Sequence, residues 1–553
     1  MQPNPTAPVG GFTARLFRWV DRVFLDLGRQ MRLSYLPPLM VYIAAGISGL
    51  TGIVGTFFVK EYLGLSAEFL AALGFWAMLP WALKMPIGHL VDLIWRHKAG
   101  LVYLGAGLIA TSLAIMIALL SDRAAMEAIM SANAWYVLSA LLAPIGYVLQ
   151  DVVADAMTVE AVPRVDESGA PISAADRRIG HTTMQTLGRV AIIGGSVLVA
   201  GANVVLFRDA PSMSAEQTAQ TYLLVYQLAL FIPLVSVLGV LLAGVLRRRR
   251  IAGLVEQGYT RGDAEKLIDV RGEERPHVNW PLLGGSLVFV VFTVSLGLAE
   301  IPYNQELIFA GSMAIVLFLM MRLVRELEPA ARNTLVGTAL LIFVFRALPG
   351  PGPGATWWMI DDLGFDQQFL SVLSLIGSAL TLVGLFLFRR FMAERSIAYV
   401  VGFLTLVGTI LSLPLLGMYY GLHHWTAAHT NGVVDARFIA LVDTALESPL
   451  GQIAMVPMLA WIANSAPDRL KATYFAVMAS FTNLALSLSQ LGTKYVNQLF
   501  TVTREVKDPQ TGSISVPADY SELGHIYITV IVVGFVLPFL VILLLRNTRY
   551  RSA

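Results

Sequence analysis

The chain contains 553 residues, 56% of them apolar and 14% charged, whereas a soluble globular domain has about a quarter charged residues. Its 39 basic and 37 acidic residues leave a net charge of +2, which gives no reason to expect a nucleic-acid partner. The absence of cysteine excludes disulfides and thiolate-bound metals. The composition predicts an all-α integral membrane protein, and we expect no enzymatic activity, no cofactor and no resident metal.

Apolar segments long enough to cross a bilayer recur along the whole chain, since one such helix needs about 20 residues. They form a first group at 39–59, 67–91, 100–120, 134–160, 180–206 and 221–246, a pair at 281–299 and 305–321, and a second group at 333–349, 367–388, 397–418, 436–463, 471–500 and 525–545. We therefore expect 14 spans, arranged as two six-helix bundles with a two-helix central insertion.

These segments divide the chain into five parts. They are a cytoplasmic amphipathic N-terminus (1–38), an N-terminal six-helix bundle (39–246), a cytoplasmic loop with an inserted helix hairpin (247–332, the hairpin at 281–321), a C-terminal six-helix bundle (333–546) and a cytoplasmic tail (547–553). The N-terminus is expected to lie on the inner leaflet as a helix, because its apolar residues recur at helical spacing opposite arginines. The inserted segments are short for a hydrocarbon core of about 30 Å, so a re-entrant hairpin is the alternative there.

The distribution of Lys and Arg predicts the orientation, because cytoplasmic connections carry an excess of basic residues. With the N-terminus inside, 29 of the 39 basic residues fall on inner segments. Five fall on outer segments: Lys60, Arg123, Arg208, Arg504 and Lys507. We therefore expect both termini to be cytoplasmic and the protein to lie in an inner or plasma membrane.

Two pairs of carboxylates lie within predicted spans, where an ionised side chain costs about 2.5–3.5 kcal/mol. Asp151 and Asp155 are four residues apart on the fourth span, and Asp443 and Glu447 repeat this spacing on the twelfth. Two carboxylates one turn apart repel each other, so one of them holds a proton more readily. The pairs are therefore candidate proton carriers. The alternative is that each acid pairs with a buried base and holds helices together.

Buried cations and nearby polar or aromatic residues indicate a binding site for an organic anion. The candidate substrate-binding residues are Lys84, Arg189, Arg346 and Lys494, together with Gln150, Gln452 and Trp81. The cations would pair with the negative groups of the substrate, and aromatic side chains would stack on its rings.

Between the second and third predicted spans, Gly88 is followed four residues later by Asp92 and then by the basic residues Arg96 and Lys98. This stretch resembles the loop signature of the major facilitator superfamily. The resemblance implies a gating loop at these four positions. The match is partial, because Leu93 occupies the position of the usual arginine.

A second resemblance is carried by longer stretches, namely LGLSAEFLAALGFWAMLPWALKMPIGHLVD, DVVADAMTVE, FVFRALPGPGPG and LESPLGQIAMVPMLA followed by KATYFAVMASFTNL. In their order and spacing these stretches resemble the folate-biopterin transporter family. The resemblance implies two six-helix halves, a substrate site at mid-depth between them and alternating access. The acid pair of the family would correspond to Asp151 and Asp155, and its second-span lysine to Lys84. The inserted hairpin departs from the usual 12 spans and is shared with the related muropeptide permeases, while light-harvesting assembly factors are a third relative.

From these features we predict a secondary transporter that moves a folate- or pterin-like organic anion together with protons. Its partners would be the lipid bilayer, a small organic anion and protons, and we expect a monomer. The alternatives are a muropeptide-type permease and a non-transporting pigment or assembly protein of the same fold. An intramembrane enzyme is disfavoured, because no nucleophile, base and orienting residue group together in the spans.

Overall fold

The structure is a computed structural model, and it describes residues 26–63, 65–166, 168–268, 280–298, 301–324, 328–388, 391, 395–451, 471–507 and 514–551. The predicted amphipathic N-terminal helix lies almost wholly outside these residues. Gln452 and the second part of the span predicted at 436–463 also lie outside them.

The described residues contain ten helical segments that are long and apolar enough to cross a membrane. They are Leu33–Tyr62, Ala67–Leu93, Ala99–Ser121, Ala132–Ala161, Ile179–Ser212, Ala215–Glu256, Asn304–Met321, Gln367–Leu387, Ile397–Tyr419 and Leu523–Arg546. The chain is therefore a helical integral membrane protein, as its composition predicts. The total of 14 spans and the domain boundaries remain predictions.

The helices fall into two groups on either side of an inserted pair. The first group is α2 (Asp26–Arg29), η2 (Leu33–Tyr35), α3 (Leu36–Ile47), η3 (Ser48–Thr51), α4 (Gly52–Tyr62), α5 (Ala67–Ala82), α6 (Lys84–Leu93), η4 (Trp95–His97), α7 (Ala99–Ser121), α8 (Arg123–Glu127), α9 (Ala132–Ala161), α10 (Ala174–Leu206), η5 (Ala210–Ser212), α11 (Ala215–Ala229), α12 (Phe231–Glu256) and α13 (Arg261–Ile268). The inserted pair is α14 (Trp280–Leu298) and α15 (Asn304–Val324). The second group is α16 (Pro329–Arg346), α17 (Pro353–Asp361), α18 (Gln367–Leu387), α20 (Ile397–Tyr419), α21 (Leu422–His429), α22 (Ala436–Glu447), η6 (Ser448–Leu450), α24 (Lys471–Leu499) and α25 (Leu523–Arg546).

Capping side chains explain where many of these helices begin. A serine or aspartate oxygen accepts a hydrogen bond from a first-turn N–H, which would otherwise lack a partner. The capping residues are Ser66, Asp122, Ser131, Ser173, Ser214, Asp366, Ser396 and Asp435. Two short antiparallel strands, β1 (Val506–Lys507) and β2 (Ile514–Val516), lie in the connection between α24 and α25.

The second predicted span is not one continuous helix. The segment predicted at 67–91 forms α5 and α6, with a break at Leu83. Pro86 explains the break, because proline has no N–H to donate to the carbonyl four residues earlier and its ring clashes with that carbonyl. The first span is divided in a similar way, with α3 and α4 separated by the η3 turn.

The segment predicted at 333–349 is also interrupted near its end. The helix α16 stops at Arg346, and α17 begins at Pro353 after a Gly- and Pro-rich connection. Gly352 in this connection has a φ of 80°, a left-handed conformation that favours glycine. A Cβ atom at Gly352 would also lie 2.6 Å from the side-chain nitrogen of Asn497.

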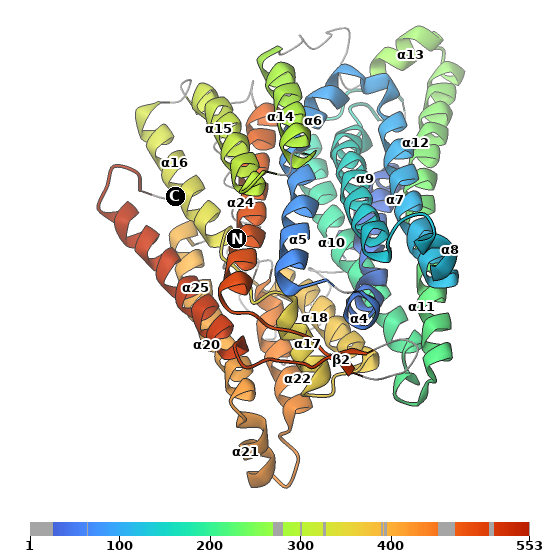
Figure 1. The fold of residues 1–553 in the computed structure, drawn as a ribbon. Coiled ribbons are helices and arrows are strands. Elements are labelled where there is room, and N and C mark those ends of the chain that lie inside the picture. Colours follow the sequence, from blue (N-terminus) through green and yellow to red (C-terminus); the bar gives the residue numbers. More distant parts are fainter. Residues whose placement is uncertain are drawn as a thin grey trace, which may run out of the picture.

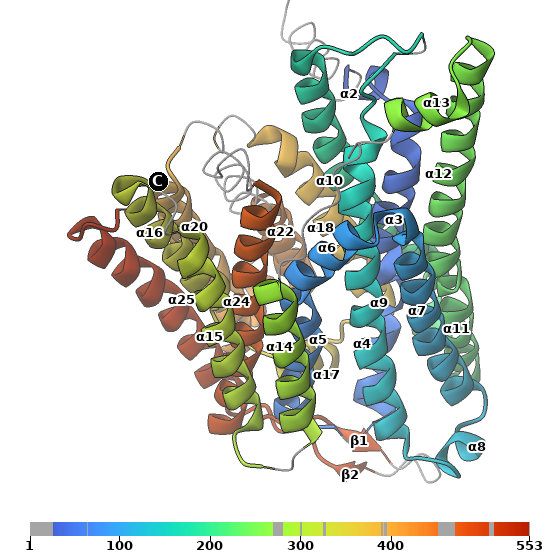
Figure 2. The same cartoon turned by 90° about the horizontal axis from the view of Figure 1, so that it is seen from above.

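The two groups of helices lie side by side and contact each other through α5 with α24 and α10 with α18 (Figure 1). We call the end of the molecule that carries the two strands the β end, and the opposite end the α13 end. The two groups come together at the β end and spread apart toward the α13 end (Figure 2).

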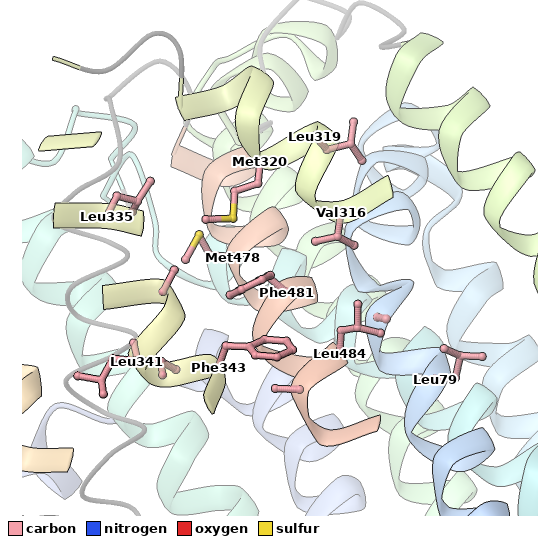
Figure 3. Close-up of a cluster of buried hydrophobic side chains, with 14 of the residues drawn as sticks. Leu79, Val316, Leu319, Met320, Leu335, Leu341, Phe343, Met478, Phe481 and Leu484 are labelled. Carbon is pink, nitrogen blue, oxygen red and sulfur yellow. The ribbon is translucent and has the colours of Figure 1, made fainter. Parts of the chain in front are cut away.

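The inserted helix α15 is part of the packed interior. Its residues Val316 and Met320 lie in one buried cluster with Met478 and Phe481 of α24 and Phe343 of α16 (Figure 3). The rings of Phe343 and Phe481 are 4.8 Å apart between centroids. Because α15 is a continuous helix of 21 residues, about 32 Å long at 1.5 Å per residue, the structure favours a spanning helix here over a re-entrant one.

Close glycine contacts join α3 to α10, and they yield a test of the packing. A Cβ atom at Gly195 would lie 2.9 Å from the Cα of Gly46, whereas one at the neighbouring Gly194 would meet nothing within 4 Å. We expect Gly195→Ala to lower the free energy of unfolding by about 1–3 kcal/mol, since overpacking costs that much. Melting temperatures of the detergent-solubilised variants would measure this. Gly194→Ala is the matched control and should not be destabilised, and equal melting of both variants would contradict the contact.

Candidate functional site

Four polar side chains from three helices meet inside the first helix group. Lys84 Nζ lies 2.5 Å from Asp151 Oδ2 and 2.8 Å from Asp155 Oδ2. The Tyr42 hydroxyl donates to Asp155 Oδ1 at 2.6 Å. One ammonium group is thus shared between two carboxylates, which provides the pairing that buried charges need. We call these four residues the acid–lysine cluster.

The local chain explains how these residues meet. Asp151 and Asp155 are one helical turn apart on α9 and therefore project from the same face. Lys84 is the first residue of α6, directly after the break at Leu83. The side chain of Asp155 is 41% exposed, compared with 19% for Lys84 and 15% for Asp151. Asp155 is therefore the member of the cluster that solvent reaches most easily.

One further cation, Arg189 on α10, lies close enough to the cluster for its charge to act on Asp151 and Tyr42. Arg346 at the end of α16 lies within the electrostatic reach of Arg189. Neither arginine forms an ion pair with any residue that the structure describes, and Nε of Arg346 is buried without a hydrogen-bond partner. Arg189 thus lies between the acid–lysine cluster of the first helix group and Arg346 of the second in its electrostatic interactions.

Gln150 and Trp81, two other predicted binding residues, have structural contacts. Gln150 is 2% exposed; its amide nitrogen donates to Val102 O at 3.4 Å and its oxygen accepts from Ser236 Oγ at 3.0 Å. Trp81 packs against a buried apolar cluster to which several helices of the first group contribute, and its backbone oxygen accepts from Asn483 Nδ2 at 3.2 Å. Gln150 thus uses both ends of its amide to join helices.

Lys494 is held by the inserted helix pair. Its Nζ lies 3.3 Å from Glu306 Oε1 on α15, and the Tyr495 hydroxyl donates to the same oxygen at 2.5 Å. These contacts attach α15 to α24. The sequence did not reveal Glu306 as the partner, because the two charges are 188 residues apart.

The second predicted acid pair lies on α22. Asp443 is half-buried and its Oδ1 has no hydrogen-bond partner, while Glu447 is exposed. No hydrogen bond or ion pair within the described part of the chain connects either acid to the acid–lysine cluster. The structure therefore does not bring the two acid pairs into contact.

The predicted gating loop contains one well-formed ion pair. Lys98 Nζ lies 2.6 Å from Glu160 Oε1 at the end of α9, and it lies 4.1 Å from the centre of the Trp95 ring. Asp92 is half-buried and Arg96 is exposed. A Cβ at Gly88 would lie 3.9 Å from Val152 on α9. The loop thus connects α6 and α7 to the same helix that carries the acid pair.

A cavity of about 530 Å³ lies between the two helix groups. Its walls come from the first four spans and α11–α12 on one side and from α17 and α24 on the other. The polar residues that line it include Ser48, Ser112, Tyr136, Ser139, Tyr147, Tyr226, Trp357, Gln490 and Thr493. The sequence did not reveal this cavity, because its lining residues come from many segments and carry no charge.

Comparisons with known proteins agree with this architecture. The profile of the BT1 family matches residues 275–550. A folate-biopterin transporter from Synechocystis sp. is 24% identical over 482 residues, which cover 86% of this chain and 77% of that protein. A putative folate transporter 2 from Plasmodium berghei is 25% identical over 164 residues, covering 29% of this chain and 33% of that one. The chain belongs to the BT1 family.

Solved transporter structures share the fold of this BT1-family protein. A POT family transporter in complex with a thioalcohol-conjugated peptide has a TM-score of 0.57 at 12% identity, covering 94% of this chain and 96% of that one. A peptide transporter POT in complex with sulfate has a TM-score of 0.53 at 15% identity, with coverage of 94% and 95%. The resemblance to folate-biopterin transporters is thus confirmed, and this BT1-family protein is a membrane transporter.

At the β end, a group of polar contacts joins the two helix groups. Lys60 at the end of α4 forms a buried ion pair with Asp361 at the end of α17. From the connection after α24, Arg504 donates to Lys60 O at 2.7 Å and to Leu65 O at 2.5 Å. Tyr520 donates to Asp361 Oδ2 at 2.5 Å. We call Lys60, Asp361, Arg504 and Tyr520 the latch.

The latch lies beside the cavity. The Arg504 guanidinium lies over the ring of Trp357 at 5.1 Å, and Trp357 lines the cavity. Burial, and after it the hydrogen bond to Asp361, raises the pKa of Tyr520 far above its usual value. The hydroxyl of Tyr520 therefore stays protonated and remains a donor. The latch of this BT1-family protein thus joins the two helix groups at the β end.

The latch makes access to the cavity testable, because the chain has no cysteine of its own. A cysteine introduced at Thr51, which lines the cavity, would report exposure through its reaction with a membrane-impermeant thiol reagent. The predicted orientation places the β end outside the cell. We therefore expect Arg504→Ala to increase the labelling rate from outside intact cells several-fold, because two hydrogen bonds between the helix groups are lost. Arg208→Ala, at an exposed arginine paired with Asp209, should leave the rate unchanged. An unchanged rate in Arg504→Ala would show that the latch does not control access.

Proposed function

We propose that this BT1-family transporter carries an organic anion of the folate or pterin class together with protons by alternating access. It would act as a monomer in an inner or plasma membrane, with both termini in the cytoplasm. The observation that carries the proposal is the pair Arg189 and Arg346, which come from different helix groups and lack an acidic partner among the described residues. A buried charge without a partner is costly, so a bound anion would supply the missing negative charge.

The position of the arginines links anion binding to movement. Arg189 belongs to the first helix group and Arg346 to the second, and their charges repel each other. An anion between them would replace this repulsion with two attractions, so it would favour the conformation in which the two groups are closest. Release of the anion would allow the groups to separate.

Protons would enter through the acid–lysine cluster. Asp155 is the most exposed carboxylate of the cluster, and it accepts from both Lys84 and Tyr42. When Asp155 takes up a proton, Lys84 retains a single ionised partner, and the net positive charge of the site rises by one unit. The site then attracts an anion more strongly. Proton and anion would therefore bind cooperatively, which is the requirement for symport.

Other predicted residues would act away from the anion. We propose that the Lys98–Glu160 pair, with Gly88, Asp92 and Arg96, controls opening at the α13 end, since it links the loop to α9. Asp443 and Glu447 would be secondary proton sites on α22. Lys494 would stabilise the inserted pair through Glu306 and would not contact the substrate.

The cavity supports transport over the alternative of a non-transporting pigment or assembly protein. Such a protein needs no space between its halves, whereas a cavity of about 530 Å³ lies there. A muropeptide-type permease would carry a different anion on the same scaffold. Uptake into reconstituted vesicles, compared for folates, pterins and muropeptides under an imposed proton gradient, tests the choice of substrate.

Asp155→Asn tests the proton pathway. The amide cannot take up and release a proton near neutral pH, so we expect this variant to lose uptake driven by a pH gradient. Counterflow exchange of the anion should persist, because exchange requires no net proton movement. Both assays use the same reconstituted vesicles. Gradient-driven uptake at the wild-type rate in Asp155→Asn would exclude Asp155 as the proton carrier.

Arg346→Ala tests the anion site. Loss of one charged hydrogen-bond donor should weaken the apparent affinity for the anion by about 10- to 100-fold. The concentration dependence of counterflow measures this without a gradient. Arg208→Ala, which removes an exposed arginine, controls for the change in net charge. Wild-type affinity in Arg346→Ala would remove this residue from the binding site.

A further inference from the structure

The cavity and the charged residues differ in chemistry. Every described residue that lines the cavity is uncharged. The cavity volume of about 530 Å³ is typical of a site for a small molecule, about 300–1,000 Å³. A charged group placed in it would have no counter-charge. The cavity is therefore suited to an uncharged chemical group that carries some polar atoms.

Several polar groups in the cavity have no hydrogen-bond partner among the described residues. Gln490 is half-buried, and its carboxamide forms no hydrogen bond with any described residue. The hydroxyls of Tyr136 and Tyr226 likewise have no hydrogen-bond partner within the described chain. By contrast, Ser112 and Ser139 are bonded to each other at 2.9 Å. None of the three free groups is sealed away from the cavity, so they are available to a ligand.

The cavity and the acid–lysine cluster share the helix α9. Tyr147 lines the cavity on α9, and Asp151 follows it by one turn. Ala77 lines the cavity on α5, and Lys84 follows it by seven residues, across the break at Leu83 and at the start of α6. A turn is about 5.4 Å long, so the neutral and charged regions are roughly 5–11 Å apart along the helices. One extended molecule can reach both.

We propose that the cavity binds an uncharged heterocycle that forms part of the transported anion, and that Gln490 determines which ring is accepted. This inference rests on the proposed anion transport. The cargo is then a molecule of two parts, a flat neutral ring and an acidic group about one to two helical turns away. The acidic group is held by Arg189 and Arg346, and the ring enters the cavity beneath the latch.

The chemistry of a carboxamide limits which ring edge it selects. Gln490 offers one acceptor and one donor side by side, so it pairs with an edge that has a donor next to an acceptor, as in a cyclic lactam. A site built around such hydrogen bonds rejects an analogue that lacks them, because its polar groups are left unpaired. A hydrophobic cavity of the same size would discriminate far less.

Protection of an introduced cysteine tests the site without requiring transport. Thr356 lines the cavity, and the chain has no other cysteine, so Thr356→Cys in the purified full-length protein reports occupancy through its reaction with N-ethylmaleimide. We expect neutral pterin to slow labelling several-fold, and p-aminobenzoylglutamate, which has the acidic part without the ring, to have little effect. Adding Gln490→Leu should abolish protection by pterin. Adding Gln227→Leu, at an exposed glutamine of α11, should preserve it.

The outcomes separate this inference from the proposed function. Thr56→Cys, on the opposite wall of the cavity, gives a second labelling site. If pterin protects neither Thr356→Cys nor Thr56→Cys, the cavity does not bind the ring, even if folate is transported. Protection that survives Gln490→Leu overturns the role of Gln490. In uptake assays, Gln490→Leu should weaken competition by folic acid about tenfold and leave competition by p-aminobenzoylglutamate unchanged. If no folate or pterin competes for uptake or is itself transported, the proposed function fails. The cysteine protection assay still tests whether the cavity binds the ring, because it does not depend on transport.

Discussion

The compensation of charge within the membrane is the constraint on which this structure depends. A single ammonium group, Lys84, neutralises two carboxylates, and without it Asp151 and Asp155 would face each other unpaired. Removing one member of such a buried set is costly, because it leaves an uncompensated charge. The set therefore fixes α6 against α9. Arg189 and Arg346 form no ion pair within the described chain, and under the proposed function a bound anion would supply their negative partner.

Interruptions in the helices supply the positions for these charges. Lys84 follows the break between α5 and α6, and Arg346 ends α16 before the Gly- and Pro-rich connection. A continuous helix satisfies its own backbone groups, whereas a break at mid-membrane leaves some of them open and is tolerated where it is buried in protein or lines a cavity. Such a break restricts the sequence. At Gly352, the positive φ and the contact with Asn497 leave no room for a side chain.

Much of the candidate site could be predicted from the sequence, because its signals are local. The spacing of Asp151 and Asp155 places both on one helical face whatever the tertiary structure. Lys494 shows where this reasoning ends, since an isolated cation in an apolar segment looks the same whether it meets a substrate or a distant acid such as Glu306. The latch and Gln490 could not be found in this way. Arg504 lies in an ordinary polar connection, and its role arises from contacts with residues more than 400 positions away.

In the proposed transport cycle, the stabilisation that the latch provides must be balanced against the repulsion between Arg189 and Arg346. Closure at the β end is held by contacts between the helix groups, and a transporter must break them in every cycle. If the latch outweighed the repulsion between Arg189 and Arg346 by about 5.5 kcal/mol, the open conformation would be populated about 10⁴-fold less than the closed one. Under the proposed function, protonation of Asp155 would ease this limit, since it would increase the net positive charge of the cluster beside Arg189. The same repulsion that makes the empty site costly would then help to open the latch.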